Sequence, residues 1–570
     1  VVASLVAGKH AELGGWEMIN KSTLEHYHPS KGMKKILHMS YADLTLPMKS
    51  CLLYLSVFPK NCTIRKDRLI WRWIAEGFIP VKGEECILDT GRSYFNELIN
   101  RSLIQPVFGT DDDENDPIGC TIHDAVHDFV VSMSSEENFV TLEEEFISMP
   151  RDVVRRLSLN YAKQEDGTLA LDLGSMNNLS QVRSLTVSGC AQRMPHLANF
   201  LLLRVLDLED AEGLESRSLE DIGRLFNLKY LGLGGSNVTE LPESIGELRL
   251  LETLDVRATK VKKLPTSIAR LQKIARLFAK VLDDIPDGIE KMQDLQELSM
   301  IIVNSRRLLN LVGALVKSRQ LKVLGVKWCF SDELQGDVQT CRSDFVSSLN
   351  KVAEHSKLEH LYLRSDGKCS LNFLADSWVP PCLLQKLVVK SVNYYFPVIP
   401  KHLASCLNLT NLEIAINLDK EEDLSIIAHL PALIILKLSV KEKRLIIRKG
   451  FACLEVLWLE CRDGAPEIDF LVGAMPKLRK LHLSFKLLPL QVQGGFHFGL
   501  RNLSSLKQVH AKIICDGASV SEVDSVERAM ERDLSRHLNN PTLKLAKHNY
   551  SEEKVTMDEG RKSTVEKVNN

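Results

Sequence analysis

One short pattern recurs along most of this chain and limits what it can fold into. Between residues 182 and 511, an apolar-x-x-apolar-x-apolar phrase occurs fourteen times, usually 21 to 28 residues after the previous one. Examples are Leu203/Leu206/Leu208, Leu228/Leu231/Leu233, Leu251/Leu254/Val256, Leu409/Leu412/Ile414, Leu454/Leu457/Leu459 and Leu478/Leu481/Leu483. No single repeat can bury its own apolar edge, so neighbouring repeats must stack to form a continuous core.

Each phrase predicts a short strand whose three apolar side chains point inward, because side chains alternate along a strand. Stacking then joins the strands into one parallel sheet. This is the pattern of leucine-rich repeats. We therefore predict an α/β fold whose larger part, residues 150–535, is an irregular leucine-rich-repeat solenoid, a parallel β-sheet horseshoe.

Between the strands, two phrases begin with Leu241-Pro242 and Leu264-Pro265. Proline fixes the backbone in an extended turn, and the aliphatic residues that follow are spaced as in a helix. The phrases therefore predict short helical segments on the convex side. Beyond residue 300 the spacing loosens. The gap from Leu321 to Leu358 predicts a helical insertion near residues 340–355.

The residues between the strand leucines should face solvent on the concave side. They include Tyr230, Thr253, Asp255, Arg257, Lys327, His360, Tyr362, Arg364, Trp458, Glu460, Arg462, Lys480 and His482. Tryptophan, tyrosine and arginine are the types that anchor protein interfaces. We therefore predict that a protein partner contacts Tyr362, Arg364, Trp458, Glu460, Arg462, Lys480 and His482.

The first part of the chain has a different pattern, which predicts a mostly helical winged-helix domain over residues 25–142. Expected helices are 31–41, 48–58, 65–78, 90–102 and 124–134, with strands at 103–108 and 119–122 around an acidic turn, Asp111–Asp116. Gly77 should end the third helix, and Leu69, Trp73 and Ile74 should share its buried face.

Winged helices often bind DNA, so the charges of this domain matter. The third helix carries Arg65, Lys66, Arg68 and Arg72. Asp67 and Glu76 interrupt these residues, and the acidic turn places carboxylates where a wing would approach phosphate. We therefore predict no nucleic-acid partner.

Several longer motifs in this region resemble one family. They are Ser40-Tyr41-x-Asp43-Leu44-x-x-Pro47, Leu69-Ile70-x-x-Trp73-Ile74-Ala75-Glu76-Gly77-Phe78-Ile79, Tyr94-Phe95-x-Glu97-Leu98-x-x-Arg101-Ser102-Leu103-Ile104 and Ile122-His123-Asp124. Together they resemble the winged-helix region of plant intracellular disease resistance proteins, the nucleotide-binding leucine-rich-repeat (NB-ARC–LRR) receptors, of the coiled-coil subgroup. The Leu-Pro-x-x-Ile repeats also suit that family.

The resemblance implies a role for one triplet. Ile122-His123-Asp124 is similar to the family's Met-His-Asp motif, whose histidine contacts the phosphate of bound ADP. It implies that His123 is a phosphate sensor and that Asp124 is its conformational partner. However, the chain has no G-x-x-x-x-G-K-[ST] phosphate loop. We expect a fragment that lacks the nucleotide-binding core and neither binds ADP or ATP strongly nor hydrolyses ATP, with residues 1–24 a remnant of that module.

Composition excludes several other classes. The net charge is −2, and no apolar run approaches the length of a membrane span. The 13 cysteines are scattered without a C-x-x-C pair, which indicates reduced thiols and a cytoplasmic protein. His123-Asp-x-x-His127 is similar to a zinc motif but has aspartate for glutamate, so we expect no metal site. Residues 540–570 are charged and weakly apolar, and we predict a disordered tail there.

The leading hypothesis is a non-enzymatic fragment of an innate immune receptor. Its repeats would recognise a pathogen effector or a guarded host protein, and its winged helix would relay that event. A leucine-rich-repeat substrate adaptor of a ubiquitin ligase is an alternative, since Leu46-Pro47 with Leu52, Leu55 and Phe58 is similar to a short helical box. An extracellular receptor ectodomain is a third, although such repeats usually carry Gly-x-Ile-Pro.

Overall fold

The structure is a computed structural model, and the chain divides into two compact units, Val1–Leu363 and Arg364–Asn570. The described residues are 29–81, 86–109, 116–143, 146, 153–161, 179–191, 194–315, 320–330, 337–355, 357–365, 369, 371–391, 395–396, 399–417, 423–441, 444–462, 464–465, 467–487, 498–516 and 518–549. Residues 1–24, expected to be a remnant of another module, lie outside them.

The first unit begins with the predicted winged-helix domain. Its elements are α3 (Pro29–Ala42), α4 (Leu46–Leu53), the 3-10 helix η1 (Tyr54–Val57), β1 (Ile64–Arg65), α5 (Lys66–Glu76), α6 (Ile87–Asn100), β2 (Gln105–Val107), β3 (Gly119–Thr121) and α7 (Asp124–Glu136). The strands form an antiparallel sheet in the order β1-β3-β2. The helices and the hairpin thus match the expected elements within a few residues. The acidic turn itself lies mostly outside the described residues.

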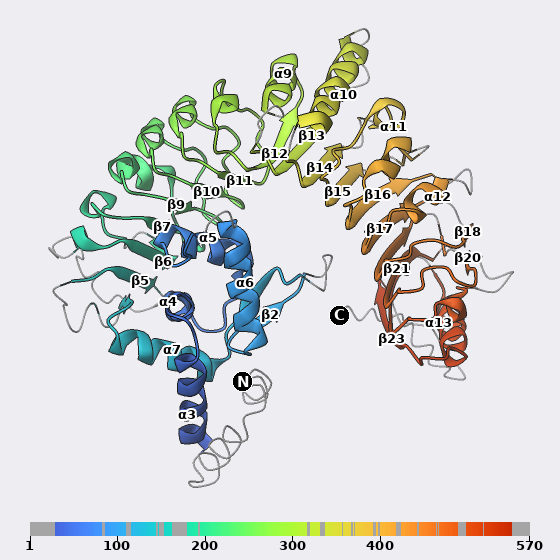
Figure 1. Ribbon diagram of the computed structural model, residues 1–570, viewed down its shortest axis with the longest axis horizontal. Helices are drawn as coiled ribbons and strands as arrows, with labels where there is room; N and C mark the ends of the chain where they lie inside the picture. The colour runs from blue at the N-terminus through green and yellow to red at the C-terminus, as the bar shows by residue number, and fades with distance from the viewer. Residues whose placement is uncertain are drawn as a thin grey trace, which may run out of the picture. The chain divides into compact units, whose positions relative to one another are not determined.

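Helix α5 is buried along most of its length, and this decides how the domain packs. Leu69 and Trp73 are fully buried in the winged-helix core, as their shared face predicts. Gly77 ends the helix with a φ of 82°, a left-handed conformation that glycine adopts without a Cβ clash. The opposite face of α5 contacts β7 and β9 of the repeats, and Figure 1 shows α5 beside these strands.

The repeats of the first unit form the predicted parallel sheet. Its strands are β4 (Thr141–Leu142), β5 (Arg156–Tyr161), β6 (Ser184–Cys190), β7 (Val205–Asp207), β8 (Ala211–Glu212), β9 (Tyr230–Gly232), β10 (Thr253–Val256), β11 (Arg276–Ala279), β12 (Glu297–Val303) and β13 (Val323–Trp328), with β14 (His360–Ser365) at the boundary between the units. The middle leucines of successive phrases lie opposite one another, in the order Leu185, Leu206, Leu231, Leu254, Leu277, Leu298 and Leu324. Each is buried, so the repeat phrase and its inward face are confirmed.

Short helical segments connect these strands. They are the 3-10 helices η3 (Leu179–Gln181), η5 (Leu197–Asn199), η6 (Ser216–Arg224), η7 (Glu243–Glu247), η8 (Thr266–Arg270) and η9 (Ile289–Lys291), and the α-helices α9 (Arg306–Leu315) and α10 (Asp337–His355). The two Leu-Pro phrases lead into η7 and η8, as expected. Helix α10 fills the wide gap in the repeat spacing and confirms the predicted insertion.

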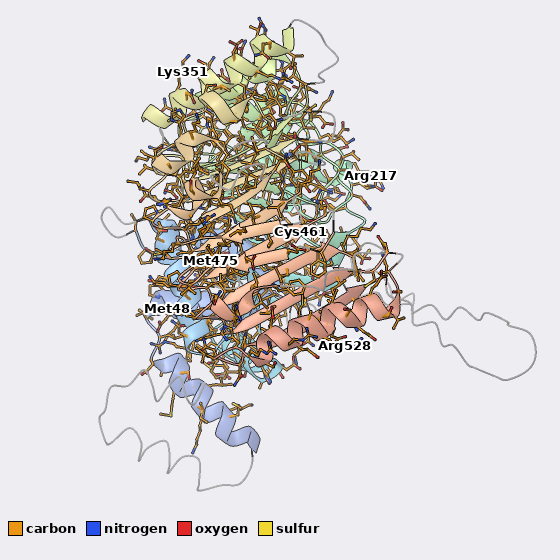
Figure 2. All side chains as sticks on the ribbon, turned by 90° about the vertical axis from the view of Figure 1, so that its right-hand side faces the viewer. Met48, Arg217, Lys351, Cys461, Met475 and Arg528 are labelled. Carbon is orange, nitrogen blue, oxygen red and sulfur yellow. The ribbon has the colours of Figure 1, made fainter. Side chains whose placement is uncertain are left out.

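The second unit continues the same architecture with longer strands. It contains α11 (Leu374–Ser377), β15 (Lys386–Ser391), η10 (Lys401–Ser405), β16 (Asn411–Ile416), α12 (Asp423–Ala428), β17 (Ile435–Val440), β18 (Arg444–Ile447), β19 (Val456–Cys461), β20 (Glu467–Phe470), β21 (Lys480–Lys486), η12 (Leu500–Asn502), β22 (Gln508–Ile514), α13 (Val520–Ser535) and β23 (Thr542–His548). Figure 2 shows these strands side by side, with α13 and its labelled Arg528 next to them.

The end of the array differs from the expectation. We predicted a disordered tail over residues 540–570, but Thr542–His548 is strand β23, paired in parallel with β22 over its whole length. The ladder of middle positions continues from buried Leu481 and Val509 to Leu543. Sequence reasoning missed this strand because its exposed face carries charged residues such as Lys544. On the opposite face, Leu543 and Leu545 are only half-buried. Residues 550–570 lie outside the described residues.

A glycine substitution tests the stacking of η7 on η8. A Cβ on Gly246 would lie 2.6 Å from the Ser267 carbonyl oxygen, whereas a Cβ on Gly32 in α3 would meet nothing within 4 Å. Gly246→Ala should therefore lower the urea midpoint of unfolding, at a cost of about 1–3 kcal/mol. Gly32→Ala is the matched control and should raise stability by about 0.5–1 kcal/mol, because alanine favours helix. Equal midpoints for the two variants would contradict this stacking.

Candidate functional site

Three arginines of the winged-helix domain meet three carboxylates of the repeats. This arginine clamp consists of Arg65, Arg68 and Arg72 on one side and Asp207, Glu209 and Asp255 on the other. Arg68 Nε donates to Asp207 Oδ2 at 2.8 Å, and Arg72 Nη1 donates to the same oxygen at 2.5 Å. Arg65 Nη2 donates to Glu209 at 2.9 Å and to Asp255 at 2.8 Å.

Local sequence explains why these groups meet. Arg65 precedes α5, and Arg68 and Arg72 follow it at spacings of three and seven, which place all three on one helix face. Asp207 and Asp255 each follow the middle leucine of a repeat phrase, so alternation turns them away from the repeat core. Helix and sheet therefore present opposite charges at matching positions.

The centre of the clamp is buried, which makes its pairing obligatory. The side chains of Arg72 and Asp207 are both 0% exposed. Burial alone would raise the pKa of Asp207, but Arg68 and Arg72 outweigh it and hold that pKa below its ordinary value. Breaking a buried pair by removing one partner typically costs about 3–5 kcal/mol, because the other charge is left uncompensated.

Further contacts extend the interface on both sides of the clamp. Arg257 of the repeats bonds Asp67 of α5 at 2.6 Å, and Arg156 Nε of β5 bonds Glu76 at 3.0 Å. The guanidinium of Arg276 lies 3.5 Å from the ring centroid of Trp71. Oppositely charged pairs thus bind the helix along its whole length, and a cation–π contact adds to them.

Sequence reasoning missed this interface and misplaced three of its residues. Tyr230, Thr253 and Asp255 were expected to face solvent, but each is buried. The reason is that the winged-helix domain covers this part of the concave face, which repeat periodicity cannot reveal. The basic face of α5, which raised the DNA alternative, is occupied by Asp207 and its neighbours.

The triplet carrying the phosphate-sensing expectation lies at the start of α7. Ile122 is buried, whereas His123 and Asp124 are exposed. His123 is the N-cap residue, and its Nδ1 accepts a hydrogen bond from the Ala125 amide at 3.2 Å. His127, one turn later, is buried, and its Nε2 lies 2.9 Å from the Phe58 carbonyl oxygen.

Four of the predicted partner-binding residues lie together in the second unit. Trp458 and Glu460 on β19 adjoin Lys480 and His482 on β21, with Trp458 directly opposite His482. The Trp458 and His482 rings stack with centroids 3.6 Å apart and planes 4° from parallel. Glu460 accepts hydrogen bonds from Ser439 and Arg462.

The other predicted residues are not part of this group, apart from Arg462 through its bond to Glu460. Arg364 is exposed on β14, with β15, β16 and β17 between it and β19. Tyr362, half-buried on β14, belongs to the first unit. A site spanning all seven residues therefore stays a prediction.

Comparison with known proteins agrees with both parts of the chain. Residues 181–543 match the leucine-rich repeat region model, and residues 57–130 match the disease resistance protein winged helix domain. Rice (Oryza sativa subsp. japonica) disease resistance protein RGA5 is 31% identical over 526 residues, 89% of this chain and 45% of that protein. Rice Pik-2 is 29% identical, over 90% of this chain and 53% of that protein. The chain belongs to the plant disease resistance protein family.

Within this family, the chain spans about half the length of the curated relatives that it matches. The Arabidopsis thaliana probable disease resistance RPP8-like protein 2 is 29% identical over 265 residues, 43% of this chain and 28% of that protein. The segment that matches the winged helix domain contains both α5 and the His123 triplet.

Two general features of this disease resistance protein bear on its chemistry. Each cysteine that the structure describes is a free thiol, including buried Cys51 and Cys120. Burial raises the pKa of Cys120 to about 12, so this thiol is protonated at neutral pH. Among the described helices, none is both long and apolar enough to cross a bilayer.

The clamp should give the protein a characteristic pH dependence. Burial, followed by the neighbouring Asp207, raises the pKa of Glu209 to about 7, although Arg68 acts in the opposite direction. The unperturbed value is 4.5, so between these values the folded state holds a proton that the unfolded state lacks. The stability contributed by this proton is present at acidic pH and is lost as pH rises through about 7.

Glu209→Gln should remove this dependence. Between about pH 5 and about pH 8, the free energy of unfolding of the wild type should fall relative to that of the variant, by up to about 3 kcal/mol. Urea titrations at successive pH values measure the difference. Glu240→Gln, at an exposed position of the same array, is the control and should follow the wild type. Parallel curves for wild type and Glu209→Gln would contradict the raised pKa.

Proposed function

We propose that this chain is the recognition and restraint region of a plant innate immune receptor. The repeats recognise a protein, either a pathogen effector or a guarded host protein, and the winged-helix domain relays that event by changing its packing. The single observation that carries the proposal is the arginine clamp, because it joins the relay element directly to the recognition array.

The clamp has the properties of a two-state restraint. Its charges are fully compensated while α5 lies on the sheet, and they become hydrated if α5 leaves. A separation that exposed only one side would leave Asp207 or Arg72 buried without its partner. Intermediate positions of α5 are therefore unfavourable, and release is all-or-none. A partner protein favours release to the extent that it binds the released array more tightly than the clamped one.

His123 supports a nucleotide-dependent part of this switch. Because its Nδ1 accepts the Ala125 amide hydrogen, the neutral ring carries its proton on Nε2, which can donate to a phosphate oxygen. The resemblance to the family implies that bound ADP supplies the anion that holds such a receptor closed. ADP/ATP switching is expected only in a receptor that joins this region to a phosphate-loop domain, since one imidazole does not cradle a diphosphate.

The ubiquitin-ligase adaptor is disfavoured by the placement of its box residues. Leu52, Leu55 and Phe58 are buried in the winged-helix core and cannot reach a ligase scaffold. Leu46 is exposed, but a single leucine does not form a binding surface. The extracellular alternative is disfavoured, because the chain is similar to disease resistance proteins and its first part matches their winged helix domain.

A charge swap tests the restraint. Glu76 of α5 and Arg156 of β5 form a pair that can be exchanged without disturbing Asp207. In a receptor that joins this region to a nucleotide-binding domain, Glu76→Arg or Arg156→Glu alone should cause cell death in leaf tissue without an elicitor. The double exchange should restore silence, because opposite charges meet again.

The control and a physical readout accompany the swap. Lys34→Glu, at an exposed position of α3, changes charge in the same domain without touching the array and should stay silent. In the purified chain, amide hydrogen exchange of α5 should accelerate in the single variants and recover in the double. Single variants that accumulate normally, remain silent and exchange like the wild type would refute the restraint.

The triplet is tested separately with Asp124→Val in the same receptor. Loss of the exposed carboxylate in the first turn of α7 removes its favourable interaction with the helix N-terminus. We expect signalling without an elicitor, scored as cell death at equal protein level. Asp128→Val makes the same chemical change one turn later, where the carboxylate pairs with Lys60, and should be silent. Silence of both variants would remove the switch role from Asp124.

A further inference from the structure

The solvent-facing side of the sheet in the second unit carries a continuous row of basic and aromatic side chains. Lys437, Trp458, His482, His510 and Lys544 occupy matched positions on β17, β19, β21, β22 and β23, each directly opposite the next. We call these five residues the basic–aromatic row. The prediction from sequence reached Trp458 and His482 but not Lys437, His510 or Lys544. Lys544 lies on β23, which was assigned to a disordered tail.

The rings of the row hold one another in place. Trp458 and His482 stack face to face at 3.6 Å, and His510 meets His482 edge to face at 4.7 Å. The ammonium of Lys437 lies 5.2 Å from the centre of the Trp458 ring. The side chains of the row are therefore already held in place. Binding of a ligand costs little of their conformational entropy.

The charge of this surface comes from lysines. Burial lowers the pKa of His482 to about 3, with further lowering by His510, Lys480 and Lys437, and burial followed by Lys544 and Lys480 lowers the pKa of His510. Both rings are therefore neutral at physiological pH. Lys512 on β22 adds an exposed ammonium beside the row.

Three carboxylates near the row have cation partners outside it. Glu413 pairs with Lys390, Glu460 with Arg462 and Asp516 with Lys486. One polar atom within the row lacks a hydrogen-bond partner. The Nε2 atom of His510 is buried and has none among the described residues. Buried polar atoms are normally satisfied, so this nitrogen is an exception within the row.

We propose that the basic–aromatic row, with Lys480 and Lys512 beside it, binds an acidic segment of the partner protein. This inference rests on the proposed recognition role of the repeats and specifies the chemistry of what they recognise. Carboxylates of the segment pair with the lysines. Lys437 and Lys544 lie four strands apart, which is about 19 Å at the usual strand spacing. About six residues of extended chain span that distance.

The ring geometry favours a protein segment over single-stranded nucleic acid. Nucleic-acid platforms offer open aromatic faces on which successive bases stack. Here the faces of Trp458 and His482 cover each other, and Lys437 lies over the Trp458 ring. The ammonium groups of Lys512 and Lys544 remain exposed, and they suit carboxylates.

Binding of a fluorescent oligoglutamate peptide to the whole purified chain tests the proposal. Fluorescence anisotropy at physiological salt should give saturable binding. The combined variant Lys480→Glu, Lys512→Glu and Lys544→Glu should weaken that binding at least tenfold, which is about 1.4 kcal/mol. The matched control is Lys401→Glu, Lys449→Glu and Lys477→Glu, which makes the same change of net charge at exposed positions of the second unit outside the row. It should leave binding within about twofold, since long-range electrostatics is screened by salt.

His510→Phe is a second control, because it leaves the lysines of the row in place. It keeps an aromatic ring and removes only a buried nitrogen that a carboxylate cannot reach, so it should leave oligoglutamate binding within about twofold. Unchanged binding in the triple lysine variant would overturn the proposal. So would tighter binding of an oligouridylate of equal charge, or the absence of oligoglutamate binding by the wild type.

This test is independent of the restraint experiment. If the charge swap behaves as proposed but the row variants bind like the wild type, the repeats use another surface and the receptor role stands. If the row binds the acidic peptide but the charge swap is silent, the row is a docking surface and the proposed restraint fails.

Discussion

The first unit depends on one buried carboxylate. Asp207 has no exposed surface and accepts hydrogen bonds from two guanidinium groups of a separate domain. An isolated charge in that position would cost several kcal/mol, so the repeats and the winged-helix domain need each other at this point. Around it, Arg65 joins two further carboxylates, and Arg72 also bonds Thr186 at 2.5 Å. Opposite charges thus determine where α5 lies, and apolar burial within each part determines the rest.

The repeat array was predictable because its signal is periodic. Each middle leucine, such as Leu254 or Leu457, is buried wherever the phrase occurs, and the wide gap gave the position of α10. The winged-helix elements were also predictable, because apolar spacing, Gly77 and the hairpin mark them locally. Strand β23 was not predicted, since one exposed face and its lysines conceal the half-buried leucines on the other face.

The candidate sites were harder to predict because they depend on contacts between distant segments. The sequence contains the arginines of α5 and the aspartates of the repeats, but nothing local says that they are partners. Asp255 was therefore assigned to the solvent-facing surface, although it lies against Arg65. Trp458 and His482 were grouped correctly because neighbouring repeats share a register. Arg364 was grouped with them by residue type alone, and three intervening strands separate it from Trp458.

The clamp also limits how this kind of array can change in length. Its acidic residues come from different repeats, with Asp207 on β7 and Asp255 on β10 and one strand, β9, between them. Inserting or deleting a whole repeat in that interval would shift Asp255 by one strand spacing, about 4.8 Å, and take it out of reach of Arg65. The same event within the second unit would leave every clamp bond intact. Repeat number is therefore fixed by geometry next to the winged helix, and variation in length can accumulate only farther along the solenoid.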